Sequence, residues 1–297
     1  MTSGLDVRLS AVIVSVADEQ PRVMTLPHAV ALPSGDLEPL QDPTLELALR
    51  RLVRQQVGIG LGYVEQLYTF GDQSRSTGGR TISIAYLALV GAGLSPADRE
   101  AAWTACYELF PWEDWRSGRP EVIDRDVVPA LEHWVADSAQ RRERADIAFG
   151  LSGSPWDGAR VLDRYELLYE VGLVEERATD SGHPVALRLG TAMVQDHRRM
   201  VATGLTRLRG KLSYRPVIFE LVPETFTLNQ LQQVAEALAG VRLHKPNFRR
   251  LVVQGGLVEG TGVADEKTGG RPAELYRFRR DVLRERPAPG VGLRSAR

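Results

Sequence analysis

The residues of this 297-residue chain that are best suited to bind another molecule lie near its C-terminus, in the stretch 245–254, KPNFRRLVVQ. Its polar side chains include Lys245, Asn247, Arg249 and Arg250. Arginine can bond guanine through two parallel hydrogen bonds, asparagine can do the same with adenine, and lysine or arginine can hold phosphates. A helix that presents these side chains in the major groove would bind double-stranded DNA, and the alternative is an ordinary solvated helix face.

The residues before this stretch predict a first helix that would position it. Thr227 precedes a run with helical apolar spacing, and Gln230, three residues on, completes a capping-box signature. Gly240 ends the run, and Pro246 suits the first turn of a second helix over 245–254. The side chains expected on the buried face of that second helix are Phe248, Leu251 and Val252.

Short strands on either side of the two helices complete the order of a winged helix-turn-helix. Residues 216–221, PVIFEL, are expected as a strand before the first helix. LVEG and LYRF are expected as two strands around a polar, Gly-rich loop that holds Arg271, which could enter a minor groove or touch a phosphate. Lys211, in the segment that leads into this module, is a further DNA-binding candidate. The complete order favours DNA binding over a solvated helix face.

A second pattern lies in the N-terminal part, where residues 44–58 have the apolar spacing of a helix closed by Gly58. The region resembles a Nudix box, the G-x5-E-x7-R-E-U-x-E-E-x-G-U pattern in which U is aliphatic. Counting back from Gly58, Arg51 falls on the arginine of the pattern, and Val53 and Ile59 fall on aliphatic positions. The spacing from Gly35 to Gly58 is two residues longer than in the pattern.

The glutamates of the Nudix box are replaced in this chain. The residues at those positions are Gln41, Leu52, Gln55 and Gln56. A Nudix hydrolase uses the glutamates to hold Mg²⁺ and to activate water, and a neutral amide is a poor substitute for a carboxylate. We therefore expect the fold without the chemistry: no catalytic residue, no metal and no enzyme activity. The alternative is an active Nudix hydrolase of ADP-ribose-type substrates with an accessory winged helix. A metal-dependent hydrolysis assay would distinguish an active hydrolase from an inactive Nudix fold.

Composition limits the class of protein further. The chain is 43% hydrophobic and 25% charged, as is usual for a soluble globular protein. It has no apolar run near the roughly 20 residues that a membrane helix needs, and no signal peptide is evident. The single cysteine, Cys106, cannot form an internal disulfide, which fits a cytoplasmic protein. Residues 241–297 carry a net charge of +7 and residues 1–240 carry −8, so a polyanion partner is expected for the C-terminal part alone.

The rest of the chain predicts an α+β unit followed by helices. Strand-like runs at 5–16, 61–70 and 81–90 accompany the helix at 44–58. Residues 96–210 are expected to be mostly helical, with apolar stripes that are more often core or dimer contact than ligand site.

Several of these segments resemble one family. The stretch FTLNQLQQVAEAL…KPNFRR…GGLVEGTG…GGRPAELYRF resembles the winged helix of the Nudix-related transcriptional regulators, the NrtR family. TFGD and RTISIAYLAL resemble two strands of the Nudix domain in the same family. The chain length and the segment YELFPWEDW resemble more closely the alphaproteobacterial regulators of NAD biosynthesis called NadQ.

The resemblance implies a dimeric repressor of NAD biosynthesis or salvage genes that binds a palindromic operator and needs no cofactor. Its effector would be an adenine nucleotide of NAD metabolism: ADP-ribose, NAD itself or ATP. The pyrophosphate of such a ligand needs cations or backbone N–H groups. Arg75 and Arg80, which flank a Gly-containing loop beside the Nudix strands, are the first candidates, and Arg51 follows them. An exposed, solvated arginine is the alternative for each.

We therefore expect an α+β protein with a Nudix-like effector-sensing domain over 1–150 and a helical, dimerising connector over 151–212. A winged helix-turn-helix over 213–285 and a tail over 286–297 would follow. Ligand binding would shift the population between two arrangements of the DNA-binding modules, so that their spacing fits or misfits the operator. A protein-interaction adaptor is a third interpretation, against which the basic C-terminal charge favours nucleic acid.

Overall fold

The computed structural model describes residues 5–26, 30–71, 80–94, 101–185, 187–265 and 272–291. Its first part is a mixed sheet with the strand order β4-β5-β1-β2-β6, in which β3 pairs with β1. The strands are β1 (Leu5–Ala17), β2 (Gln20–Thr25), β3 (Ser34–Asp36), β4 (Tyr63–Phe70), β5 (Arg80–Leu89) and β6 (Ala102–Ala105). β1 is parallel to β5 and antiparallel to β2 and β3. The strands predicted at 5–16, 61–70 and 81–90 are confirmed as β1, β4 and β5, whereas the sequence does not predict β3 and β6.

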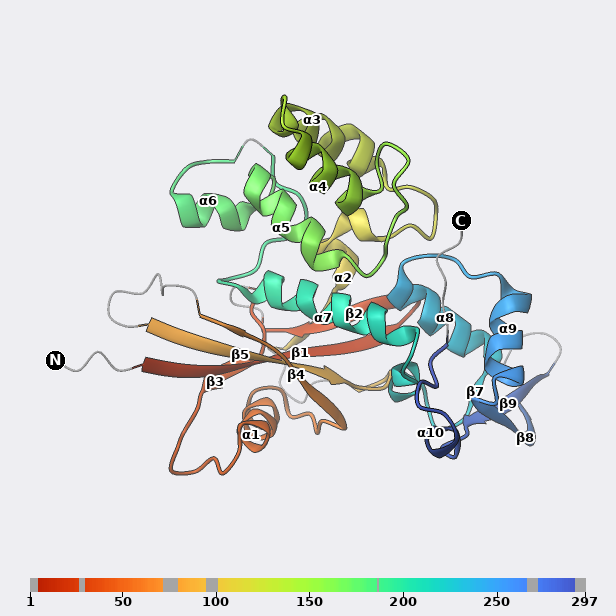
Figure 1. The fold of residues 1–297 in the computed structure, drawn as a ribbon. Helices are drawn as coiled ribbons and strands as arrows, with labels where there is room; N and C mark the ends of the chain where they lie inside the picture. The colour runs from red at the N-terminus through yellow and green to blue at the C-terminus, as the bar shows by residue number, and fades with distance from the viewer. Residues whose placement is uncertain are drawn as a thin grey trace.

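Helices cover both faces of this sheet (Figure 1). Odd residues of β1, such as Leu9 and Ile13, pack against α1 (Leu45–Val57), and even residues, such as Val12, pack in the core on the other face. On that second face lies α7 (His197–Leu212), whose Gly204 lets the helix approach closely, because a Cβ there would lie 3.0 Å from a methyl of Val12. β1 is therefore buried on both faces over this part of its length, which explains the uninterrupted apolar stretch at residues 11–14.

A layer of shorter helices lies above α7 in Figure 1. They are α2 (Cys106–Leu109), η1 (Pro111–Glu113), η2 (Ile123–Val127), α3 (Val128–Val135), α4 (Ala139–Phe149), α5 (Val161–Val171) and α6 (Glu175–Ser181). The expectation of helix from residue 96 onward is wrong at β6, which pairs with β2 at the sheet edge. Helices α3 and α4 pack against each other and against α5, so they lie with the helices and not with the sheet.

A buried charge cluster joins these layers. Glu113 is 1% exposed and binds the guanidiniums of Arg164 and Arg209, with 2.9 Å between its Oε2 and the Arg164 Nη2. Burial alone would raise the pKa of Glu113, but the two positive charges outweigh it and hold this pKa below its usual value. Arg209 Nε also donates to the carbonyl of Leu238 at 2.8 Å, and Trp115 N donates to that of Gly240 at 2.7 Å. The cluster therefore anchors the C-terminal end of a helix that belongs to the next module.

That module has the predicted helix-turn-helix and hairpin. Its elements are η3 (Val217–Leu221), β7 (Phe226–Thr227), α8 (Leu228–Ala239), α9 (Lys245–Gln254), β8 (Val258–Asp265), β9 (Ala273–Phe278) and α10 (Val282–Glu285). β7, β9 and β8 form a three-stranded antiparallel sheet. The predicted capping box of Thr227 and Gln230 is confirmed, and Gly240 ends α8 in the left-handed conformation.

Two local expectations for this module are wrong. Residues 217–221 form a 3₁₀ helix and not a strand, because Val217, Ile218 and Leu221 are buried together, which an alternating strand could not achieve. Leu251 of α9 is 41% exposed and does not share the buried face.

The chain end returns to the start of this module. Val291 is buried and its N–H donates to the carbonyl of Leu212 at 2.8 Å. Gly290 passes so close to Tyr214 that a Cβ would lie 2.1 Å from the backbone nitrogen of that residue. Part of the predicted tail therefore straps the segment that connects α7 to η3. None of the helices in the described ranges has the length and apolarity that crossing a membrane requires.

Candidate DNA-binding face and nucleotide site

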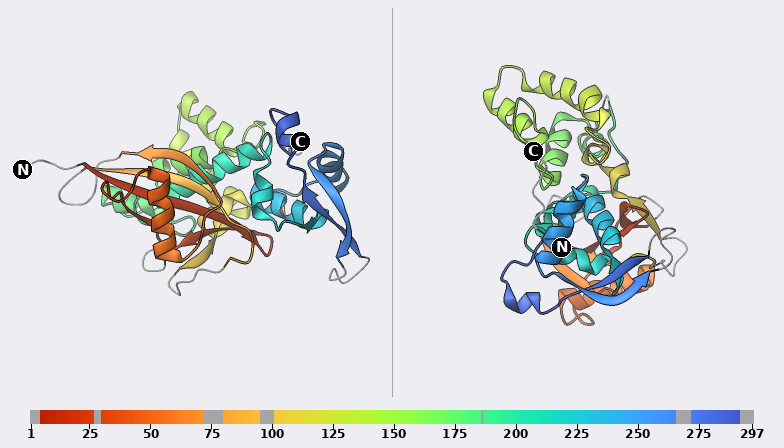
Figure 2. Two further views of the ribbon diagram at one scale, coloured as in Figure 1. Left: turned by 90° about the horizontal axis from the view of Figure 1, so that it is seen from below. Right: turned by 90° about the vertical axis from the view of Figure 1, so that its right-hand side faces the viewer.

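Helix α9 is fixed by its buried face and presents the opposite one. Phe248 and Val252 are at most 1% exposed and hold the helix in the core of the module. With about 100° between successive residues, Arg250 points opposite this pair, and Asn247 and Gln254 lie together on one side of it. All three side chains are exposed. Figure 2 (left) shows this module at the end of the molecule opposite the N-terminus, so that α9 is open to a long partner.

The basic side chains of α9 have no carboxylate partner in the described part of the chain. Lys245, Arg249 and Arg250 are exposed, and no ion pair with a described residue engages them. A hydrogen bond to Glu274 raises the pKa of Tyr276 on β9, and the charge of Arg249 opposes that rise. Arg249 therefore lies on the flank of α9 next to the β8–β9 hairpin, while Arg250 occupies the centre of the exposed face.

The other two DNA-binding candidates differ from these. Arg271, in the loop between β8 and β9, lies outside the described residues. The structure places Lys211 away from α9: its Nζ donates to the hydroxyl of Tyr63 at 3.0 Å and binds the carboxylate of Glu65. The Lys211 side chain is 14% exposed. Lys211 thus docks α7 onto β4, and we do not group it with the DNA-facing residues.

In the Nudix-like part, α1 has the predicted start and end. Thr44 caps it through a hydrogen bond to the N–H of Leu47, and Gly58 ends it with a φ of 70°. Arg51 forms two hydrogen bonds with Asp42, at 2.9 and 2.6 Å, and lies 3.3 Å from Glu38. The hydrogen bond from Arg51 lowers the pKa of Asp42. Arg51 therefore holds the loop that precedes α1.

Two of the side chains at the glutamate positions of the Nudix-like pattern, those of Gln56 and Leu52, have structural contacts. Gln56 accepts from the N–H of Ser34 at 3.0 Å and donates to its carbonyl at 2.7 Å, which ties α1 to β3. Leu52 is buried beneath Gly35, where a Cβ would lie 2.6 Å from a Leu52 methyl. The described residues include no group of three or more His, Cys, Asp or Glu that could hold a metal ion.

The remaining nucleotide candidates are placed only in part. Arg75 lies outside the described residues, and Arg80 begins β5, opposite Leu5 in the parallel register with β1. The side chain of Arg80 is not among those described. Of the three predicted ligand-binding side chains, the structure thus describes Arg51 alone.

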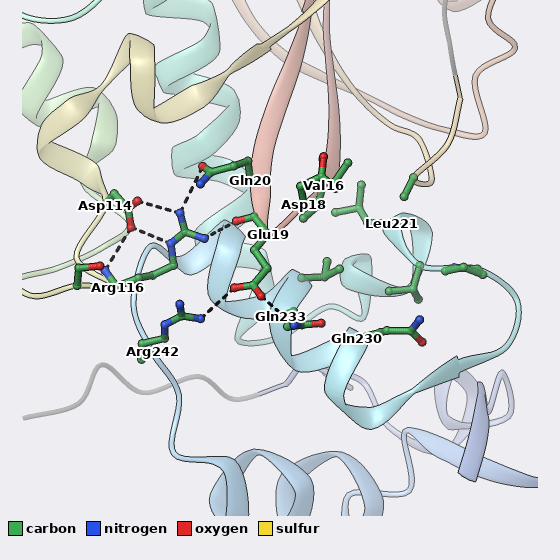
Figure 3. Close-up of a pocket in the computed structure, with 16 residues that line it drawn as sticks. Val16, Asp18, Glu19, Gln20, Asp114, Arg116, Leu221, Gln230, Gln233 and Arg242 are labelled. Atoms are coloured by element: carbon green, nitrogen blue, oxygen red, sulfur yellow. Dashed lines mark hydrogen bonds and ion pairs between the residues drawn. The ribbon is translucent and has the colours of Figure 1, made fainter. Parts of the chain in front are cut away.

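A cleft between the sheet and the winged helix brings together residues that the sequence did not indicate (Figure 3). It has a volume of about 770 Å³ and is lined by the β1–β2 turn, the loop after η1, the end of η3 and one face of α8. Glu19 from the turn reaches Gln233 of α8 and Arg242 of the turn before α9. These residues lie more than two hundred positions from Glu19 in the sequence, and no local pattern connects them.

Comparison with known proteins agrees with this geometry. Residues 218–278 match the family model for the NrtR DNA-binding winged helix domain. A curated relative from Acinetobacter baylyi, named ADPR responsive transcriptional repressor NtrR, is 23% identical over 248 residues, which cover 84% of this chain and 69% of that protein.

Two solved structures share the fold over most of the chain. Shewanella oneidensis NrtR in complex with a 27mer DNA is 22% identical, with a TM-score of 0.54 over 94% of this chain and 95% of that chain. A MutT/nudix family protein from Enterococcus faecalis is 13% identical, with a TM-score of 0.50 over 94% of this chain and 88% of that chain. The predicted resemblance is therefore confirmed: residues 218–278 form a winged helix of the NrtR family, which follows a Nudix-like α+β part.

Proposed function

We propose that this protein is a DNA-binding transcriptional repressor whose Nudix-like part senses an adenine nucleotide of NAD metabolism. The observation that carries the proposal is helix α9 itself, whose exposed Lys245, Arg249 and Arg250 have no described carboxylate partner within an NrtR-type DNA-binding module. Exposed cations without partners can neutralise DNA phosphates, and arginine can also bond a base edge.

ADP-ribose is the first effector to test, ahead of NAD and ATP, because the curated relative is named as ADPR responsive. Arg75 and Arg80 are the phosphate ligands that we propose. Arg51 ranks behind them, because its guanidinium is held by Asp42 and Glu38 and would have to leave these carboxylates to bind a phosphate. No cofactor is needed for such a role, and the genes controlled would be those of NAD biosynthesis or salvage.

We further propose that the chain does not hydrolyse nucleotides. Gln56 and Leu52 hold α1 against β3 at positions where a Nudix hydrolase has metal-binding glutamates. Incubation with ADP-ribose or NAD in Mg²⁺ or Mn²⁺ tests this statement. Turnover on the order of 1 per second or more, an ordinary enzyme rate, would favour the alternative of an active hydrolase with an accessory winged helix.

The chain would act as a homodimer on a palindromic operator. Its sensing domain would span 1–150, its dimerising connector 151–212 and its DNA-binding domain 213–285. A closer relation to the NadQ regulators stays a prediction. In a two-fold dimer the distance between the two α9 helices must match one helical turn of DNA or a multiple of it, so a small change in that distance alters operator affinity.

The decisive experiment titrates DNA fragments from upstream of NAD biosynthesis genes and a shuffled control, with and without ADP-ribose. We expect tighter binding to one natural fragment, and a change in that affinity by a factor of about 5 to 150 when ligand is added. Equal affinity for natural and shuffled fragments would overturn the repressor function. Specific binding that none of the three nucleotides changes would overturn sensing alone.

A further inference from the structure

The turn between β1 and β2 has an unusual backbone. Asp18 and Glu19 are consecutive, and both have a positive φ, of 50° and 56°. Hairpin turns with two such residues strongly favour Asn-Gly or Asp-Gly, because only glycine adopts this region without steric cost. A glutamate in this conformation persists where surrounding contacts hold it, and such strain is often found at functional positions.

The contacts that hold Glu19 come from outside its own hairpin (Figure 3). Its carboxylate accepts from Nε2 of Gln233 at 2.9 Å and lies 3.3 Å from Nη1 of Arg242. Its backbone carbonyl accepts from the guanidinium of Arg116, which is 7% exposed and bound to Asp114. Glu19 thus connects the sheet to the helix-turn-helix through its side chain and to the loop after η1 through its backbone.

Asp18 provides the opposite case within the same turn. Its side chain is 84% exposed and pairs with Arg22 of the same hairpin at 2.7 Å. The turn therefore has two strained positions, but only Glu19 reaches the winged helix.

The partners of Glu19 bear directly on the recognition helix. Arg242 lies in the short turn between α8 and α9, and it also binds Glu236 of α8 at 2.7 Å. Glu236 in turn accepts from the N–H of Leu243 at 3.0 Å. A displacement of the Glu19 carboxylate would thus act on the residues that set where α9 begins.

The winged helix has room to respond. The C-terminal end of α8 is anchored through Leu238 and Gly240, close to the Glu19 contact. Toward the other end of α8, the cleft of about 770 Å³ separates the hairpin from residues 221–223 and Gln230. A change in the position of the hairpin would therefore alter the width of this cleft and the position of α8 relative to the sheet.

We propose that Glu19 is a positioning residue that couples the sheet to the orientation of the winged helix. β1 is the central strand and is paired along its length with β2, β3 and β5, so a change in the Nudix-like part would move the turn as a rigid extension. The effector part of this inference rests on the proposed function. The contact itself and its effect on DNA affinity do not require an effector.

The test compares Glu19→Gly with Asp18→Gly in the full-length protein. Glycine relieves the positive φ in both variants, but only Glu19→Gly removes the contact with the winged helix. Amide hydrogen exchange, measured without DNA or nucleotide, should show faster exchange across residues 233–243 for Glu19→Gly only. Equal exchange in the two variants, or none faster than in the parent, would overturn the contact.

The coupling is tested with operator DNA and ADP-ribose. Glu19→Gly should retain the parent's affinity for ADP-ribose while the effect of this nucleotide on DNA affinity falls toward a factor of one, and Asp18→Gly should behave as the parent does. An unchanged ADP-ribose effect in Glu19→Gly would overturn the coupling. If the parent itself shows no nucleotide effect, the sensing function fails. The DNA affinity of Glu19→Gly should in that case still differ from that of the parent. This affinity and the hydrogen exchange then test the role of the contact.

Discussion

Outside the winged helix, Glu113 lies buried between the guanidiniums of Arg164 and Arg209. The three basic side chains of α9, by contrast, are exposed and have no described carboxylate partner. The difference follows from solvation. A charge moved out of water must be paired, because its lost hydration costs several kcal/mol, while an exposed cation can stay unpaired until an anion arrives. The buried Arg164 and Arg209 therefore stabilise the fold, whereas the exposed arginines of α9 can bind a partner.

Arg51 of α1 lies between these two cases. It is at the surface and on a helix marked by a functional pattern, yet two carboxylates hold it. Residue type and helix position together therefore do not identify a binding residue. In α9, by contrast, three exposed cations without a described carboxylate partner lie together on one helix of a DNA-binding module.

The largest expected effect is that of Glu113→Gln on the buried charge cluster. This substitution keeps the size of the side chain and removes its charge. Arg164 and Arg209 would then be buried without a counter-charge, and we expect a loss of about 3–5 kcal/mol in the free energy of unfolding, measured with denaturant. The control is Glu132→Gln, since Glu132 is exposed and pairs with Arg142 at the surface. If both variants were equally stable, the buried cluster would not be what holds the layers together.

A second prediction concerns His197 of α7, whose burial keeps its imidazole uncharged. His197 is 3% exposed and its Nδ1 accepts from the N–H of Leu32 at 2.9 Å. Burial, helped by the charge of Arg8, lowers the pKa of His197 to about 4. The unfolded chain therefore binds more protons between pH 6.5 and 4, so stability is full above this window and falls through it, by about 3 kcal/mol in total.

Denaturation at a series of pH values checks this expectation. His197→Gln should flatten the loss between pH 6.5 and 4, whereas His183→Gln, at an exposed histidine, should leave it unchanged. The same pH profile in parent and His197→Gln would mean that another group controls acid stability.

The parts of the fold that the sequence predicted are those encoded locally. The capping pair Thr227 and Gln230, the glycine that ends α1 and the Val- and Ile-rich composition of β1 each depend on neighbours in the chain. The sequence does not indicate β6, because a four-residue strand exists only through its pairing with β2. Nor does it indicate the buried partner of Arg209, which lies 96 residues away. In the same way, no spacing rule indicates that Glu19 meets Arg242.

For the binding face the sequence identified the helix but not the roles within it. The pattern predicted Asn247, Arg249 and Arg250 together, and the structure adds that Arg250 is central and that Arg249 lies beside β9. The sequence places Lys211 just before the module and so suggests a DNA contact, whereas its contact with Glu65 depends on how α7 lies across β4. The nucleotide candidates Arg75 and Arg80 stay predictions.

The geometry of α9 predicts different losses for its two neighbouring arginines. Arg250→Ala should weaken specific operator binding by about 1–3 kcal/mol and relax the preference for one base pair, as expected for a base contact. Arg249→Ala should weaken binding to all sequences alike, because a flank residue is better placed for phosphates. Fluorescence anisotropy with parent and singly substituted operators measures both effects, and Arg142→Ala on α4 is the control. Reversed roles would mean that α9 enters the groove rotated from the orientation inferred from its buried face.

The smallest expected effect separates two lysines by their partners. Lys245 lies at the start of α9, where a cation and the helix N-terminus can act on one phosphate. Each phosphate neutralised by a protein releases a counterion, so Lys245→Ala should reduce the slope of log affinity against log salt by about one. Lys211→Ala should leave that slope unchanged, because the ammonium of Lys211 already binds Glu65 and Tyr63. The measurement needs DNA affinities at four or more salt concentrations for both variants and the parent. An equal reduction for the two lysines would show that Lys211 leaves Glu65 when DNA binds, and pairing within the free protein would then no longer separate structural from DNA-binding cations.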